Sequence, residues 1–98
     1  MRVRFEWDEN KDASNFRKHG VRFETAAQVF GDPHCLMTQD REVDGEERWQ
    51  TIGMVGGVLL LFVAHTVDDD QDEDLSVRII SARKVTPEER RRYEAAAD

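Results

Sequence analysis

The stretch LSVRIISARKVTPEERRRY, residues 75–93, contains the two elements that the sequence defines best. Its first eight residues are rich in aliphatic and β-branched side chains, which is typical of a strand. Thr86 follows as a possible N-cap, Pro87 takes the first helical position and Glu89 the third, which is the pattern of a capping box. The sequence therefore predicts a strand that leads directly into a helix, and the helix is expected to end at about Ala97.

This segment also concentrates the positive charge of an acidic chain. The formal net charge is −7, yet residues 78–98 hold 6 Lys/Arg against 4 Asp/Glu, whereas residues 1–77 hold 8 against 17. Net acidity disfavours nucleic-acid binding over the whole surface, because phosphates repel carboxylates. A local basic cleft remains compatible with it, and a natural protein partner is expected to be basic.

Length and composition indicate one globular domain over residues 1–98, with 39% hydrophobic residues. The longest apolar run, residues 57–64, is far shorter than the ~20 residues needed to cross a bilayer. The N-terminus lacks the apolar stretch of a signal peptide, and the single Cys35 cannot form an internal disulfide. We therefore expect a cytoplasmic protein that does not enter the membrane.

Outward from this segment, the N-terminal part of the chain predicts a strand followed by a helix. VRFEW at residues 3–7 alternates apolar and polar side chains, which is the pattern of a half-buried strand. Residues 9–19 are compatible with a helix that ends at Gly20. Ala13 and Phe16 are the expected buried positions of this helix.

The middle of the chain predicts one more helix and a group of strands linked by turns. The expected elements are a helix over residues 23–30, a short strand over 35–38, a polar loop over 40–47, and two strands over 48–55 and 57–66 that meet at Gly56-Gly57. The last three strands have short connections and are therefore expected to be antiparallel. The order β-α-α-β-β-β-β-α predicts an α+β fold, in which an antiparallel sheet of about four to five strands packs with two N-terminal helices and one C-terminal helix.

The acidic residues 68–74 have the alternating aspartates of a calcium-binding loop but fail its other requirements. An EF-hand loop that starts at Asp68 needs glycine at its sixth position and glutamate at its twelfth, where this chain has Glu73 and Ile79. The single cysteine and the three histidines form no cluster with zinc-ligand spacing. We therefore expect a solvated acidic loop, no metal and no cofactor.

Basic side chains near the end of the last strand are candidates for binding a phosphodiester. Arg83 and Lys84 lie on a connector that must be exposed, and their cationic groups suit phosphate. Because side chains alternate along a strand, Arg78 and Arg83 point to opposite faces of a regular strand. A β-bulge or an early strand end is needed to bring them together. For the arginines at 90–92 the simpler interpretation is a solvated helical face.

Aromatic side chains offer possible stacking surfaces for bases. Trp7 alternates with charged residues in a strand and is expected in the core. Trp49 follows a polar loop and is the better stacking candidate, with a core position as the alternative, and Tyr93 is a further aromatic of this kind.

Two distinctive motifs lie at opposite ends of the chain. The first is FEWDENKDASNFRKHGVRFETAAQVFGDP at residues 5–33, which contains FEWD, KHGV and VF-x-DP, and the second is RIISARKVTPEERRRYE at residues 78–94. Both motifs resemble signatures of the BrnT family of bacterial toxins, and His65-Thr66 matches the end of an internal strand of that family. The resemblance covers nearly the whole chain, and the chain departs from the family pattern mainly at its acidic residues 68–74.

The resemblance implies the toxin of a type II toxin–antitoxin pair, with a fold similar to that of RelE-like ribonucleases. It implies metal-independent RNA cleavage that inhibits translation. It also implies neutralisation by a cognate BrnA-like antitoxin within a hetero-oligomer. Operator DNA is contacted in such pairs through the antitoxin, so the expected direct partners of this chain are the antitoxin and the RNA substrate.

The resemblance also suggests roles for individual residues. RNA cleavage without a metal needs a base for the 2′-hydroxyl, cations for the charged phosphorane and an acid for the leaving 5′-oxygen. Arg83 and Arg78 are expected to stabilise the phosphate, with Lys84 sharing that role, and His65 is the candidate general acid or base. A structural His65, bonded to a neighbouring carbonyl, is the alternative. The expected RNA-binding residues are Lys18, His19, Trp49, Ser81 and Arg90.

A second class of function is compatible with the same residues. No pair of side chains forms an unmistakable catalytic couple in the sequence, so the alternative is a non-catalytic module that binds protein or RNA. Expression of the chain alone separates the two classes, because growth arrest is expected of a nuclease toxin and not of a binding module.

Overall fold

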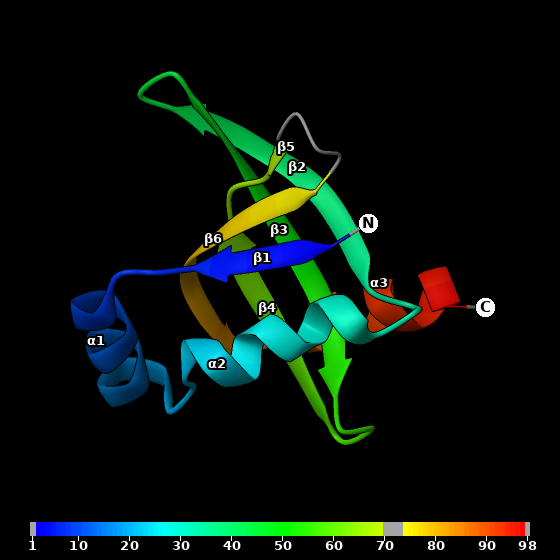
Figure 1. Ribbon diagram of the computed structural model, residues 1–98. Helices are drawn as coiled ribbons and strands as arrows, with labels where there is room; N and C mark the ends of the chain where they lie inside the picture. Colours follow the sequence, from blue (N-terminus) through cyan, green and yellow to red (C-terminus); the bar gives the residue numbers. More distant parts are fainter. Residues whose placement is uncertain (1, 70–73, 98) are drawn as a thin grey trace.

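The computed structural model in Figure 1 describes residues 2–69 and 74–97. Its strands are β1 (Val3–Glu6), β2 (Leu36–Val43), β3 (Glu46–Val55), β4 (Leu59–His65), β5 (Asp68–Asp69) and β6 (Leu75–Lys84). Its helices are α1 (Glu9–His19), α2 (Phe23–Ala26), the 3-10 helix η1 (Ala27–Gly31) and α3 (Pro87–Ala97). The α+β class and the three helical regions expected from the sequence are thus confirmed. None of the described helices is long and apolar enough to cross a membrane.

The strands form one mixed sheet in the order β1-β6-β4-β3-β2, with the short β5 paired to β6. The pairs that were expected to be antiparallel, β3 with β4 and β4 with β6, are antiparallel. The sequence predicted a fully antiparallel sheet, yet β1 runs parallel to β6. The cause is the long chain segment between them, because parallel neighbours need a crossover connection rather than a tight turn.

The hairpin between β2 and β3 is longer than the sequence predicted. The prediction of a polar loop over residues 40–47 is wrong, because β2 continues to Val43 and β3 begins at Glu46. Only Asp44 and Gly45 form the turn, with φ of 51° and 78°, as a two-residue hairpin turn of the Asp-Gly type requires. Polar side chains are tolerated along this strand because β2 is an edge strand whose residues are mostly exposed.

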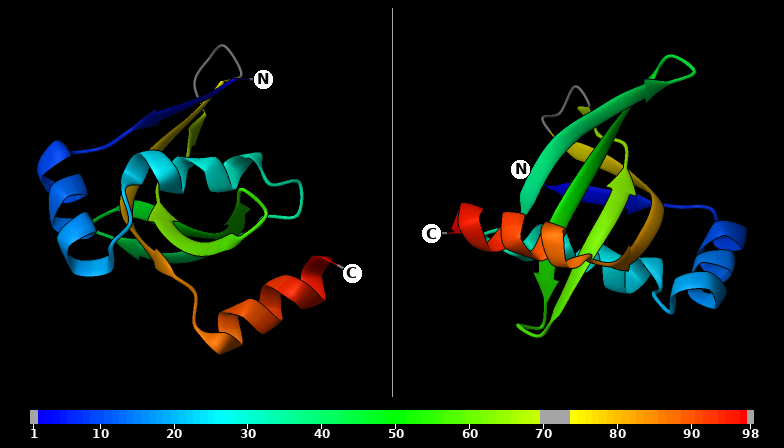
Figure 2. Two further views of the ribbon diagram at one scale, coloured as in Figure 1. Left: turned by 90° about the horizontal axis from the view of Figure 1, so that it is seen from below. Right: turned by 180° about the vertical axis from the view of Figure 1, so that it is seen from behind.

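Helices cover both surfaces of the sheet (Figure 2). We call the surface that carries α2 and η1 the α2 face, and the surface that carries α3 the α3 face. The main core lies under the α2 face and consists of Val21, Phe23, Ala26, Val29, Leu61, Val63, Val77, Ile79 and Ala82. Trp7 packs against this core, as expected, with its ring edge-on to Phe23 at 6.2 Å between centroids.

The helix expected over residues 23–30 changes its type after Ala26. A 3-10 helix has three residues per turn, so the side chain that follows Ala26 onto the inner face is Val29. Val29 is fully buried, whereas Ala27 and Phe30, which an α-helical stripe would bury, are only partly buried. The buried stripe therefore differs from the one expected for an α-helix, because the 3-10 helix has a shorter period.

The helix α1 begins and ends as predicted, with Asp8 accepting hydrogen bonds from two backbone amides and Gly20 in the left-handed conformation. Its buried face is different from the expected one. Phe16 is 42% exposed and lies under the guanidinium of Arg22, 4.1 Å from its ring centroid. Asn15 is buried instead, because its amide bonds to backbone groups on a neighbouring strand.

The helix α3 is held to the sheet by its first turn and by Tyr93. Thr86 and Glu89 form the predicted capping box, with Glu89 Oε1 accepting from Thr86 N at 2.9 Å and Thr86 Oγ1 accepting from Glu89 N at 3.2 Å. Tyr93 packs on Ile52 and donates its hydroxyl to Asp32 Oδ2 at 2.5 Å. This burial removes Tyr93 from the set of possible stacking residues.

The docking of α3 predicts an unusual tyrosine titration. The hydrogen bond to Asp32 first, then burial, then the Asp32 charge raise the pKa of Tyr93 from 10.0 to about 12. Because the folded state favours the neutral phenol, this contribution to stability is present below about pH 10 and is lost as the pH rises towards 12. Tyr93 is the single tyrosine, so its absorbance after rapid alkaline mixing should report a midpoint near 12, and Asp32→Asn should lower it. A midpoint near 10 in the folded wild type would show that α3 is not docked in this way.

Candidate functional site

A β-bulge in β6 places Arg78 and Arg83 on the same face of the sheet. Ala64 pairs with Ser81, but His65 pairs with Ile79, so that Ile80 is an extra residue in β6. Val77, Ile79 and Ala82 lie in the core of the α2 face, so the alternation shifts by one residue between positions 79 and 82. The two arginines consequently both project from the α3 face, which is the condition that the sequence left open.

The helix α3 leaves part of its face of the sheet uncovered (Figure 2, right). Arg78, which projects from this face, belongs to a group of charged side chains. Arg78 Nη2 donates to Glu46 Oε1 at 2.6 Å, and Arg48 Nε lies 3.3 Å from the same oxygen. We call these three residues the Arg78 cluster. Arg48 Nε is buried and makes no hydrogen bond of acceptable geometry among the described residues, and the Arg78 side chain is 40% exposed. One donor of the cluster is therefore without a hydrogen-bond partner among the described residues.

The pKa of the Glu46 carboxylate in the Arg78 cluster lies below that of an ordinary glutamate. The hydrogen bond from Arg78 lowers the pKa of Glu46, burial opposes this effect, and the charges of Arg78, Arg48 and Lys11 lower it further. The effect of the Lys11 charge, which comes from α1, is the smallest of these. Glu46 is thus in contact with two cations, which come from β3 and β6.

A groove between α1 and β6 lies beside the bulge. It has a volume of about 200 Å³. Its lining residues are Lys11, Ser14, Asn15, Lys18, His19, Ile80 and Ser81. We call it the α1–β6 groove. It brings together the expected RNA-binding residues Lys18, His19 and Ser81, and it shares Lys11 with the surroundings of the Arg78 cluster.

Asn15 fixes the position of α1 against β6. Its side-chain amide donates to the carbonyls of Val21 and Ala82, each at 2.9 Å, and its oxygen accepts from the amide of Ala82 at 3.1 Å. Both backbone groups of Ala82 are thus satisfied by one side chain at a point where β1 no longer pairs with β6. The α1–β6 groove therefore has a defined shape.

Arg83 shares the face of the Arg78 cluster but not its environment. It forms two parallel hydrogen bonds to Glu89, at 2.8 and 2.9 Å, donates to the carbonyl of Lys84 at 3.2 Å and stacks on Phe62 at 4.2 Å. Five residues of strand separate Arg83 from Arg78, or roughly 15 Å, and their guanidinium groups bind different carboxylates. The structure does not bring these two groups to one point.

Two other expected residues lie away from the Arg78 cluster. Lys84 is exposed and pairs with Leu61, which belongs to the α2 face. Arg90 is exposed on α3, directly after Glu89. Among the described residues, no hydrogen bond or ion pair joins either of them to Arg78.

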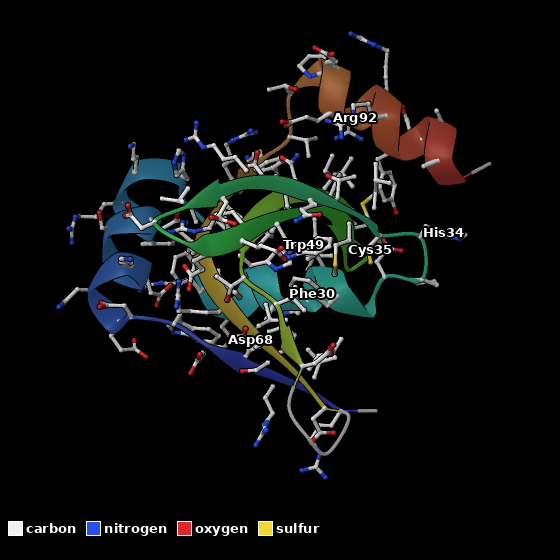
Figure 3. The ribbon with its side chains drawn as sticks, turned by 90° about the horizontal axis from the view of Figure 1, so that it is seen from above. Phe30, His34, Cys35, Trp49, Asp68 and Arg92 are labelled. Carbon is white, nitrogen blue, oxygen red and sulfur yellow. The ribbon has the colours of Figure 1, made fainter. Side chains whose placement is uncertain are left out.

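Trp49 and His65 face the opposite side of the sheet. Trp49 is half-buried and pairs with His65 in register, and it comes from β3, whereas Phe30 comes from η1 (Figure 3). His65 is fully buried, with Nε2 2.7 Å from Thr51 Oγ1 and Nδ1 3.1 Å from the Thr66 carbonyl oxygen. Burial lowers the pKa of His65. The structure thus agrees with the structural alternative for His65, which lies on the side of the sheet opposite the Arg78 cluster.

The described residues hold no group of three or more His, Cys, Asp and Glu side chains that could bind a metal ion. The acidic residues 68–74 lie partly outside the described residues. Asp68 and Asp69 form β5, an element that the sequence did not predict.

The sequence did not identify Glu46, Arg48 and Lys11 as site residues. Glu46 was placed in a polar loop, and Arg48 was taken only as the start of a strand. The Asp44-Gly45 turn was the available signal, because a two-residue turn makes Glu46 and Arg48 alternate positions of one strand face.

Comparison with known proteins matches this chain to one family. The family model described as ribonuclease toxin, BrnT, of type II toxin-antitoxin system matches residues 7–89. The crystal structure of the Brucella abortus ribonuclease toxin BrnT superposes with a TM-score of 0.58 at 21% identity, covering 88% of this chain and 99% of that chain. This similarity shows a shared fold. No curated protein matches the chain.

Proposed function

Because the chain belongs to the BrnT family of ribonuclease toxins of type II toxin–antitoxin systems, we propose that it is an endoribonuclease that cleaves RNA at the Arg78 cluster. One observation carries this assignment: a partly exposed carboxylate, Glu46, is in contact with two guanidinium groups on an uncovered sheet face. These are the chemical groups that phosphodiester transfer from a ribose hydroxyl needs when no metal takes part.

In the proposed reaction the ribose 2′-oxygen forms a bond to the adjacent phosphorus, and the bond from phosphorus to the 5′-oxygen breaks. Glu46 accepts the proton of the 2′-hydroxyl. Arg78 and Arg48 donate hydrogen bonds to the phosphoryl oxygens, where negative charge increases in the transition state. The products are a 2′,3′-cyclic phosphate and a free 5′-hydroxyl, and no metal or other cofactor enters the balance.

The α1–β6 groove supplies the proton donor and a second phosphate contact in this proposal. His19 protonates the leaving 5′-oxygen, while Lys18 and Ser81 bind the phosphate of the neighbouring nucleotide. Lys11 lines the groove, and its charge also acts on Glu46 of the cluster, so an extended strand of RNA can contact both. Arg83 then has a different role, which is to hold α3 through Glu89.

The toxin–antitoxin family implies an antitoxin as partner. We propose that it is a BrnA-like protein that forms a hetero-oligomer with this chain, and that operator DNA is contacted through it. The RNA cleavage is proposed to inhibit translation, in the manner of RelE-like ribonucleases. The acidic net charge of −7 favours a basic antitoxin and faster association at low ionic strength.

The test is cleavage of a synthetic RNA by the purified chain in the presence of a chelator of divalent metals. We expect cleavage to continue in the chelator and to leave cyclic phosphate ends. The matched control is the same oligonucleotide with 2′-O-methyl groups, which should stay intact because the nucleophile is blocked. Expression of the chain alone should arrest growth, and co-expression of the neighbouring open reading frame should relieve the arrest.

Each negative result has a specific meaning. Cleavage that stops when the chelator is added contradicts the metal-independent mechanism. Absence of both cleavage and growth arrest, with RNA or protein binding retained, assigns the chain to the class of non-catalytic modules instead.

A further inference from the structure

The strand β1 forms an outer edge of the sheet and exposes apolar side chains there. It pairs with β6 and with no other strand of the described residues. The sequence predicted a half-buried strand, but all four of its residues are exposed, with Val3 at 38% and Phe5 at 36%. An uncovered edge strand with apolar side chains is a template for pairing with another chain.

The side chains of β1 open into an apolar groove. Val3 and Phe5 are in register with Leu75 and Val77, so they project towards the α2 face. They form a groove of about 450 Å³ together with η1. Phe30 lines this groove and contacts Phe5, with the two ring centroids 5.4 Å apart.

The backbone of β1 also has hydrogen-bonding groups that face outward. Leu75 N donates to the carbonyl of Arg2 at 2.9 Å. In a parallel pair alternate residues of a strand bond to the same neighbour, so Arg2 and Arg4 bond towards β6. The amides and carbonyls of Val3 and Phe5 therefore point to the free edge, where an added strand can bond to them.

Negative charge lies at the amino-terminal end of this edge. Asp69 of β5 pairs with Leu75, and Leu75 pairs with Val3, so these residues form one row across three strands. Two strand spacings place Asp69 roughly 10 Å from Val3. Asp74 is adjacent, with its Oδ1 accepting from Arg2 N at 3.2 Å.

We infer that this edge is a docking site for the antitoxin, which adds an extended segment to β1. The segment places alternate apolar side chains on Val3, Phe5 and Phe30 and a lysine or arginine at the acidic end of this edge, where Asp74 lies beside Arg2. Strand addition of this kind combines main-chain hydrogen bonds with side-chain pockets. The inference rests on the proposed function only in taking an antitoxin as the partner, because the groove lies on the α2 face and the Arg78 cluster on the α3 face.

The test compares three variants for binding to the product of the neighbouring open reading frame by calorimetry. Phe5→Lys should weaken binding by roughly tenfold to a hundredfold, since a buried phenylalanine contact is lost and a charge is placed in the groove. Val3→Pro should weaken it by about tenfold, because it removes one outward amide while the bonds to β6 remain. Val58→Lys is the matched control: Val58 is 84% exposed in the β3–β4 turn, and affinity should not change.

RNA cleavage by each variant without antitoxin separates this inference from the proposed function. All three should cleave RNA like the wild type, because none of the substituted residues lies on the α3 face. A chain without nuclease activity whose binding is still weakened by Phe5→Lys refutes the proposed function and supports the docking site. Wild-type affinity in both edge variants refutes the docking site.

Two further results would also overturn the inference. If Phe5→Lys abolishes self-association and leaves the affinity for the neighbouring product unchanged, the occupant is a second copy of this chain. If Phe5→Lys lowers the thermal midpoint, its weaker binding could come from partial unfolding, and the test then rests on Val3→Pro alone. Wild-type affinity for the neighbouring product in Val3→Pro then rejects strand addition.

Discussion

Replacing Arg78 with alanine is expected to lower the rate of RNA cleavage by about 100-fold to 1000-fold, the usual loss when one preorganised donor to a transition-state charge is removed. The same change should leave stability almost unaffected, because a partly exposed ion pair contributes about 0–1 kcal/mol. The measurement is single-turnover cleavage of RNA together with thermal unfolding. The combination of lost activity and retained stability is the signature of a residue that contacts the substrate.

Arg83→Ala is the matched comparison and should behave in the opposite way. Arg83 donates three hydrogen bonds within the protein, two of them to Glu89, and the loss of this charged pair should cost about 2 kcal/mol. Activity per folded molecule should remain within a few-fold of the wild type. Arg91→Ala, an exposed position on α3, should change neither quantity. Lost turnover in Arg83→Ala at unchanged stability, with Arg78→Ala active, would move the phosphate-binding role to Arg83.

Glu89→Gln makes this comparison sharper, because it breaks the ion pair from its other side. If Arg83 only holds α3, Glu89→Gln and Arg83→Ala should destabilise the protein to a similar degree and leave turnover similar. A phosphate-binding Arg83 would instead become more available in Glu89→Gln, so that turnover rises while stability falls.

Those parts of the fold that depend on local chemistry could be predicted from the sequence. The capping box at Thr86 and the ends of α1 rest on hydrogen bonds between residues a few positions apart. The strand that precedes α3 was recognisable from its aliphatic and β-branched residues. The parallel pairing of β1 could not be predicted, because it depends on where a distant strand finds a free edge. The short helical period of η1 also follows from packing and not from local pattern.

The candidate site could be predicted only in part, for a similar reason. The basic residues Arg78, Lys18 and His19 are visible in the sequence, but their arrangement depends on a β-bulge at Ile80 that no residue type predicts. His65 shows the opposite case: a histidine near a strand end is a reasonable catalytic candidate until the side of the sheet is known. Burial against Phe30, with ring centroids 4.9 Å apart, decides against it.

Gly53→Ala is expected to have the largest effect on stability, through one methyl group. A Cβ at this position would lie 2.7 Å from Val29 Cβ and 2.8 Å from the Val29 carbonyl oxygen. Because these atoms belong to the backbone of η1 or are attached directly to it, a change of rotamer cannot relieve the clash, and η1 must move away from β3. Overpacking of this kind costs about 3 kcal/mol, which for a domain of this size lowers the thermal midpoint by roughly 10–25 °C.

The control for this change is Gly31→Ala. Gly31 is the last residue of the 3-10 helix that contains Val29, but nothing lies within 4 Å of a Cβ added there. Its thermal midpoint should stay close to that of the wild type. The double variant Gly53→Ala/Val29→Ala should not recover stability, because alanine keeps the Cβ and the carbonyl oxygen that cause the clash. Recovery in the double variant, or a wild-type midpoint for Gly53→Ala, would mean that η1 does not rest directly on β3. The close approach of these two backbones also fixes the position of Phe30 in the groove beside β1. A displaced η1 should therefore weaken antitoxin binding. RNA cleavage at the other face of the sheet should persist.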